Sequence, residues 1–140
     1  MIQQTACTVF KVNLASGLED FTATSSYTYK IALYTANANL GPDTTVYTSD
    51  GEVTGTGYTA TGKPLTIIPV ATGNSTVAYI SFDNVTWSPA NFTARGALIY
   101  NSTTGAAVCV LDFGSDKTAT NTFTVTFPSA TSTDAVIRLN

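Results

Sequence analysis

The chain has 140 residues, with 6 Lys plus Arg, 9 Asp plus Glu and no histidine, for a formal net charge of −3 at pH 7. So few cations cannot neutralise a phosphate track, which argues against nucleic-acid binding. Without histidine, Ser-His-Asp and Cys-His catalysis and most zinc sites are excluded.

Hydroxyl side chains take the place of the missing charges, with 27 Thr and 11 Ser. Threonine is stiff at χ1 and favours the pleated sheet, so this composition predicts β structure. No apolar run approaches 18 residues, so no membrane span is expected. The first residues lack a basic region followed by an apolar run, which predicts no secretory signal and synthesis in the cytoplasm.

The N-terminal third contains one clear strand. Residues 1–8 are polar and outside any alternating pattern, so we expect an arm that reaches a neighbouring subunit. Residues 10–14, FKVNL, fit a strand or one helical turn, and Gly17 just past the end favours the helix. Residues 27–34, YTYKIALY, alternate cleanly and predict a strand.

The middle of the chain predicts several short strands separated by turn formers. Pro64 and Pro69 lack ladder donors, so the strand they bound is expected at a sheet edge. The expected strands are 52–61, broken by glycines, then 65–70, 77–82 and 85–87.

The stretch around which the chain is organised runs from Phe92 to Asp112. Two apolar segments flank the turn formers 101–105, which predicts a β-hairpin. Because the second segment is apolar on both faces, we place this hairpin at the centre of a sandwich. Residues 114–121 are expected to form a loop, followed by strands over 122–127 and 135–139.

Eight or nine short strands, with turn signals every 8–12 residues, predict an all-β protein. The expected architecture is a jelly-roll-like β-sandwich of two antiparallel sheets in one domain, residues 1–140.

The two cysteines, Cys7 and Cys109, show no metal-binding spacing and no basic neighbour in sequence. We interpret them as buried reduced thiols, with a disulfide as the alternative and without a catalytic role.

The acidic residues fall mostly at turns, where a carboxylate binds its own backbone. A calcium site on Asp50/Glu52 or on Asp112/Asp116 is a less favoured reading, and a pair of catalytic carboxylates is the least favoured. The acids are Glu19, Asp20, Asp43, Asp50, Glu52, Asp83, Asp112, Asp116 and Asp134.

Other motifs also have structural readings. Gly55-Thr-Gly57 and the segment 114–118 resemble phosphate loops only superficially, and we read both as turns. Trp87 lies in an alternating segment, which favours core packing over a ligand platform. Arg95 in an apolar strand needs a partner, either Asp83, Asp112 or another chain. The Asn-x-Ser/Thr sequons, weak evidence for glycosylation, are at Asn74, Asn84, Asn91 and Asn101.

No catalytic, cofactor-binding or metal-binding residue is therefore predicted. Five segments nevertheless carry a resemblance: YKIALYT (29–35), GTGYTA (55–60), TARGALIY (93–100), VLDFGSDKT (110–118) and FPSATSTDAVIRL (127–139). They resemble strands and turns of the jelly-roll cement, or decoration, proteins of tailed-phage capsids, of the kind carried by a Bordetella podophage.

The resemblance implies a non-enzymatic virion protein on the outside of an HK97-type head, made in the host bacterial cytoplasm. It implies that the protein bridges major capsid subunits as a homodimer, with a trimer as the alternative, and uses no cofactor. A receptor- or glycan-binding β-sandwich of a tail or head fibre is the second hypothesis.

Overall fold

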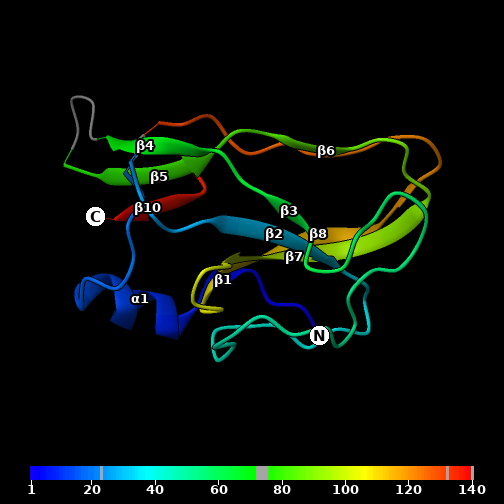
Figure 1. Ribbon diagram of the computed structural model, residues 1–140, viewed down its shortest axis with the longest axis horizontal. Coiled ribbons are helices and arrows are strands. Elements are labelled where there is room, and N and C mark those ends of the chain that lie inside the picture. The colour runs from blue at the N-terminus through cyan, green and yellow to red at the C-terminus, as the bar shows by residue number, and fades with distance from the viewer. Residues whose placement is uncertain (23, 72–75, 132, 140) are drawn as a thin grey trace.

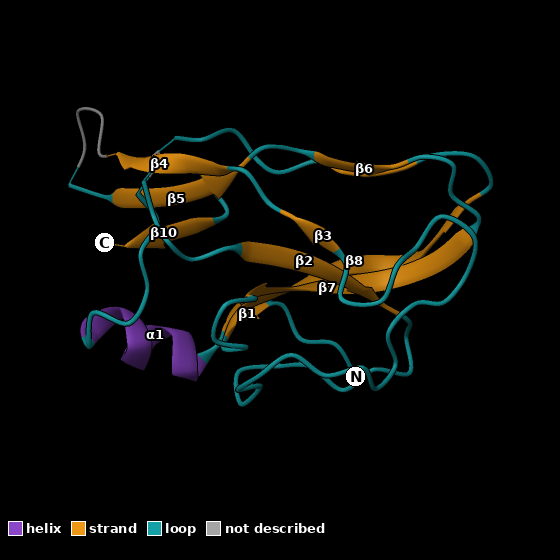
Figure 2. Cartoon of the chain, viewed as in Figure 1, coloured by secondary structure: helices purple, strands orange, loops and turns teal. Residues whose placement is uncertain are grey.

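The computed structural model describes residues 1–22, 24–71, 76–131 and 133–139. These residues form ten strands and one helix (Figures 1 and 2). All pairs between the named strands are antiparallel, which confirms the all-β prediction. No helix in the described residues has the length and apolar character needed to cross a bilayer.

One layer is a five-stranded sheet in the order β1-β8-β7-β2-β3. The predicted hairpin, β7 and β8, lies at its centre, and four successive β8 residues from Ala107 to Val110 are buried, so both faces of that stretch are covered. The strands are β1 (Thr5–Ala6), β2 (Tyr29–Tyr34), β3 (Lys63–Pro64), β7 (Phe92–Asn101) and β8 (Ala107–Ala119).

The second layer consists of two small sheets, β10-β5-β4 and β6-β9, which lie end to end across the five-stranded sheet in Figure 1. The structure thus has three sheets in two layers and ten strands, where two sheets and eight or nine strands were expected. The jelly-roll connectivity stays a prediction. The strands are β4 (Ile67–Ala71), β5 (Ala78–Phe82), β6 (Val85–Trp87), β9 (Phe123–Val125) and β10 (Ile137–Leu139).

Two groups of aromatic rings fill the space between the layers. In the first, Phe21 stacks on Tyr29 with ring centroids 4.4 Å apart. In the second, Trp87 meets Phe123 edge to face at 6.1 Å. Trp87 is only 1% exposed, which confirms its predicted place in the core. Such ring contacts add to the stabilisation that burial gives.

The helix α1 (Thr8–Ala15) confirms the helical reading of residues 10–14 and extends it in both directions. Its residue Phe10 is buried in the first aromatic group. Gly17 has φ +74° and donates its N–H to the carbonyl of Leu14, which ends the helix where glycine was expected.

Residues 1–8, expected as an arm that reaches a neighbouring subunit, pair in part with the sheet of their own chain, and a contact with a neighbour stays a prediction. Thr5 and Ala6 form β1 and pair with β8. Ile2 is buried and its side chain lies beside Gly96, where an added Cβ would come within 3.0 Å of it. A segment that looks polar in sequence is therefore held by its few apolar residues and by backbone pairing.

Two further predictions need correction. The segment 52–61 is not a strand, because Gly51, Gly55 and Gly57 adopt positive φ angles and only isolated bridges attach it to the sheet. The expected loop at 114–121 instead belongs largely to β8, which runs to Ala119 through a shift of register opposite Arg95. Bulge residues around Gly114 resemble a loop in sequence.

The predicted edge positions are confirmed. β3, which contains Pro64, is the outer strand of the five-stranded sheet, and β4, which contains Pro69, is the outer strand of the β10-β5-β4 sheet. A change of register interrupts the β4–β5 pairing between Ile68 and Ala71.

Candidate functional site

Both cysteines are free thiols in buried positions, as the sequence indicated, and the alternative disulfide is not formed. Burial, with a smaller contribution from Asp43, raises the pKa of Cys7 to about 11. Burial also raises the pKa of Cys109. Because the thiolate is the reactive form, neither side chain is poised as a nucleophile.

Arg95 meets Asp112, one of its predicted partners, with 3.1 Å between Nε and Oδ1. The same carboxylate oxygen accepts the N–H of Gly114 at 2.9 Å. The Gly114 N–H, followed by the Arg95 guanidinium, holds the pKa of Asp112 below its ordinary value. Asp112 therefore fixes the β8 bulge, which argues against the suggested calcium site with Asp116.

Glu52 is the centre of an unexpected polar cluster. Its carboxylate accepts hydrogen bonds from the hydroxyl of Tyr47 at 2.5 Å, the hydroxyl of Tyr58 at 2.6 Å and the N–H of Thr61 at 2.8 Å. Asp50 is exposed in the preceding turn. With the Glu52 oxygens occupied by protein donors, the proposed Asp50/Glu52 calcium site loses its main ligand.

The Glu52 cluster ties the loop 35–62 to one face of the five-stranded sheet. The hydroxyl of Tyr58 also accepts the N–H of Leu33 in β2, and Tyr100 of β7 donates to the carbonyl of Thr61. Burial first, and then hydrogen bonding to Glu52, raises the pKa of Tyr58. These contacts are those of a structural anchor, since the phenols are held in their neutral form.

A second carboxylate, Glu19, is only 9% exposed. Its Oε1 accepts from the Tyr29 hydroxyl at 3.1 Å and from the Asn101 amide at 2.8 Å. Its Oε2 has no hydrogen-bond partner within the described part of the chain. Burial raises the pKa of Glu19, against the opposing effect of the two hydrogen bonds.

The remaining predicted candidates lie in turns or on the surface. Asp20 accepts the N–H of Thr22, and Asp134 accepts from the hydroxyl of Thr131, as expected for turn residues. Among residues 1–22, 24–71, 76–131 and 133–139, no group of three or more metal-ligating side chains comes together.

The sequons divide by burial. Asn101 is fully buried and holds Glu19, so it cannot carry a glycan in the folded chain. Asn84 and Asn91 are exposed. Asn74 lies outside the described residues.

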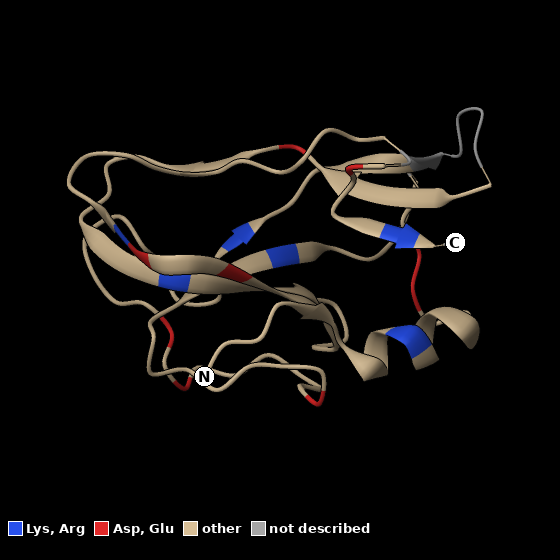
Figure 3. Cartoon of the chain, turned by 180° about the vertical axis from the view of Figure 1, so that it is seen from behind, with Lys and Arg blue, Asp and Glu red and all other residues tan. Residues whose placement is uncertain are grey.

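The outer face of the β6-β9 ribbon is covered by hydroxyls. Thr86 and Thr124 are exposed cross-strand partners, with 3.0 Å between their Oγ1 atoms. Their neighbours Val85 and Trp87 in β6 are buried. We call the exposed set, Thr86, Thr122, Thr124 and Thr126, the threonine face. Figure 3 shows no Lys, Arg, Asp or Glu on β6 or β9.

A second candidate surface lies beside α1. Val12 is 58% exposed there, and a groove between the helix and residues 42–45 is lined by Thr8, Val9, Val12, Pro42, Thr45 and one acid, Asp43. In Figure 1, α1 lies at the lower left, below β10, and β6 lies at the upper right. The two surfaces are therefore at different ends of the molecule.

The Arg95–Asp112 pair and the Glu52 cluster differ in how far each could be predicted from the sequence. The Arg95–Asp112 pair was predicted because a lone charge in an apolar strand needs a partner. The Glu52 cluster was missed, although Tyr47 and Tyr58 within six residues of an acid are a signal for it. No family model matches the chain, and no curated protein or solved structure matches it either.

Proposed function

We propose that this chain is a structural virion protein that cements a phage head. It binds the outside of an HK97-type capsid and bridges neighbouring major capsid subunits. The observation that carries the proposal is the threonine face, an exposed strip of hydroxyls on a regular β-ribbon with one cation, Lys63, bound to the carbonyl of Thr86. The resemblance of five segments to capsid cement proteins supports the same proposal. Both cysteines are buried and their pKa values are raised, so they are not reactive thiols, which fits a structural role.

The physical argument is one of desolvation. Hydroxyls lose water more cheaply than ions when a surface is buried against protein, and each finds hydrogen-bond partners in a polar interface. A bridge needs two contact surfaces, and the threonine face and the α1 groove lie at different ends of the molecule (Figure 1). Many copies with modest individual affinity then stabilise the shell by multivalency.

Self-association is part of the proposal. We infer a homodimer on the outer capsid surface, with a trimer as the alternative, formed through faces of the sandwich. Pairing through the outer strands is less favourable, because Pro64 and Pro69 lack the N–H that a ladder requires. If the chain is a virion protein, it is synthesised in the cytoplasm of the bacterial host.

The threonine face gives a matched pair of variants as the test. Thr124→Lys places a charge in the proposed contact, and we expect occupancy on heads lacking the protein to fall by about tenfold or more. Thr118→Lys is the control, because Thr118 is also exposed and also pairs with a cross-strand threonine, Thr93, at 2.9 Å. Co-sedimentation and cryo-imaging measure occupancy.

Equal occupancy for both variants would show that the threonine face is not part of the capsid contact. If the unchanged protein did not bind to heads, the cement proposal would be wrong.

The glycan-binding alternative is less well supported. No aromatic ring among the described residues is in the exposed class, whereas a glycan platform on the outer surface would call for one. Binding on a glycan array would nevertheless favour it.

A further inference from the structure

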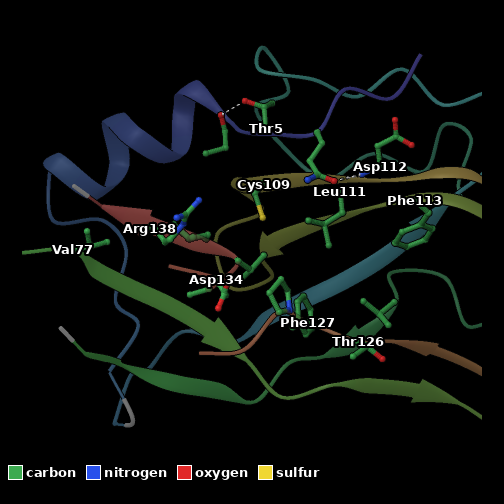
Figure 4. A pocket seen from close by; sticks show the side chains of 17 residues that line it. Thr5, Val77, Cys109, Leu111, Asp112, Phe113, Thr126, Phe127, Asp134 and Arg138 are labelled. Atoms are coloured by element: carbon green, nitrogen blue, oxygen red, sulfur yellow. Dashed lines mark hydrogen bonds between the residues drawn. The ribbon is translucent and has the colours of Figure 1, made fainter. Parts of the chain in front are cut away.

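The two layers do not close completely along one side of the sandwich. A cavity of about 700 Å³ lies between β8 and β1 in one layer and β9, β10 and the residues joining them in the other. In Figure 4 side chains from both layers point toward this space, Cys109 and Leu111 from β8 and Phe127 from the opposite side. The volume is in the range of pockets that hold small molecules.

The walls of the cavity combine polar surface, to which Gln4 and Thr5 contribute, with apolar side chains that the period-two alternation of β8 turns toward the other layer. Cys109, Leu111 and Phe113 alternate along β8, and Leu111 and Phe113 remain half-exposed. Opposite them lie Phe127 and Ile137, which are buried. The apolar part of the lining that solvent can reach is therefore mainly Leu111 and Phe113.

The rim of the cavity carries three charged side chains, of which two already have partners. Asp112 binds Arg95 and the N–H of Gly114. Asp134 accepts hydrogen bonds from the hydroxyls of Thr131 and Thr133. Arg138 on β10 is exposed and forms no ion pair with the described residues. A guanidinium in this position is suited to a carboxylate, sulfate or phosphate group.

We propose that this cavity is a binding site for a small amphipathic anion, with an alkyl or aryl body against Leu111 and Phe113 and the anionic head at Arg138. Neither the cement proposal nor the threonine face is needed for this site, so the two proposals can fail separately. The ligand is a soluble molecule rather than a bilayer, because the apolar side chains of the lining lie between the layers and not on an outer surface.

The test uses octyl sulfate below its micellar concentration, followed by calorimetry and by amide chemical shifts. We expect saturable one-site binding, with shifts at Leu111, Phe113 and Ile137. Octyltrimethylammonium, which has the same chain and the opposite charge, and butyl sulfate, which has a shorter chain, should each bind about tenfold more weakly.

Two variants and one control locate the site. Arg138→Gln should weaken octyl sulfate binding by about tenfold, and Leu111→Glu, which places a carboxylate where the alkyl body would lie, should weaken it further. Lys117→Gln removes an exposed cation of β8 that does not line the cavity and should change nothing. Shifts gathered at Val9 and Val12, or affinity unchanged in both variants, would overturn the proposal.

Discussion

Two carboxylates of this chain, the half-buried Glu52 and the buried Glu19, differ in how their oxygens are paired. Glu52 accepts three donors and joins a loop of nearly thirty residues to the sheet. Glu19 accepts two donors through one oxygen and leaves Oε2 without a partner among the described residues. A carboxylate is stabilising in the interior only when its oxygens are paired, so the Glu52 site supports the fold and the Glu19 site works against part of it.

The difference extends to the chain around each carboxylate. Near Glu52, Gly51, Gly57 and Gly62 lie so close to neighbouring backbone that no Cβ fits. Close backbone approach and a fully paired carboxylate together hold this loop in place, although it contains almost no regular structure. Around Glu19 no such tight approach of glycines occurs among the described residues, since the nearby Gly17 has open space beside it.

The largest expected loss of stability comes from a change that displaces the loop 35–62 while leaving the Glu52 carboxylate intact. In Gly57→Ala, the new Cβ would lie 1.8 Å from the carbonyl oxygen of Pro89, at a φ of +88°. We expect the free energy of unfolding to fall by about 3–4 kcal/mol. Gly114→Ala is the control, with a φ of +82° and open space, and should lose only about 1 kcal/mol. Chemical denaturation measures both, and equal losses would contradict the close contact.

Removing the anchor itself should have the next largest effect. Glu52→Ala leaves the hydroxyls of Tyr47 and Tyr58 and the N–H of Thr61 without their acceptor, and we expect a loss of about 2–3 kcal/mol. The near-ultraviolet dichroism of the tyrosines should fall as well. Asp50→Ala, two residues away in an exposed turn, should change stability by less than about 0.5 kcal/mol. If the Glu52 variant were as stable as this control, the Glu52 cluster would contribute nothing measurable to the free energy of unfolding.

The smallest effect tests the Glu19 side. Because burial raises the pKa of Glu19 above its ordinary value of 4.5, the folded chain holds the proton more tightly than the unfolded chain. The resulting stabilisation is present below that ordinary value and is lost as the pH rises through the folded-state pKa. The stability of the wild type relative to Glu19→Gln should therefore increase on acidification from pH 7 toward 4.5. A difference that stays flat or falls would contradict the raised pKa.

Comparing the wild type with Glu19→Gln also removes the contribution of carboxylates whose pKa values are lowered in the folded chain. Asp112 and Asp20 have lowered pKa values, mainly through the N–H groups of Gly114 and Thr22, so their contributions are lost on acidification. Both residues are present in wild type and variant alike. The difference between the two proteins therefore isolates Glu19.

Much of the sheet could be predicted because its signals are local. The β7–β8 hairpin follows from turn formers between two alternating segments, and the outer position of β4 follows from Pro69. The Glu52 anchor could not be predicted with confidence, because its tyrosines act through a loop whose path is set by glycine backbone angles. Ile2 was missed for a related reason, since one apolar side chain in a polar segment shows no periodicity.

The outer strands of the sheets have a consequence for crowding. β1 and β3 are two residues long, β10 is three, and β4 is interrupted by Pro69 and a change of register. Short or interrupted edge strands of this kind offer few free backbone groups with which a strand of another chain could pair. Molecules set side by side at very high local density would thus stay individually folded instead of fusing into fibrils.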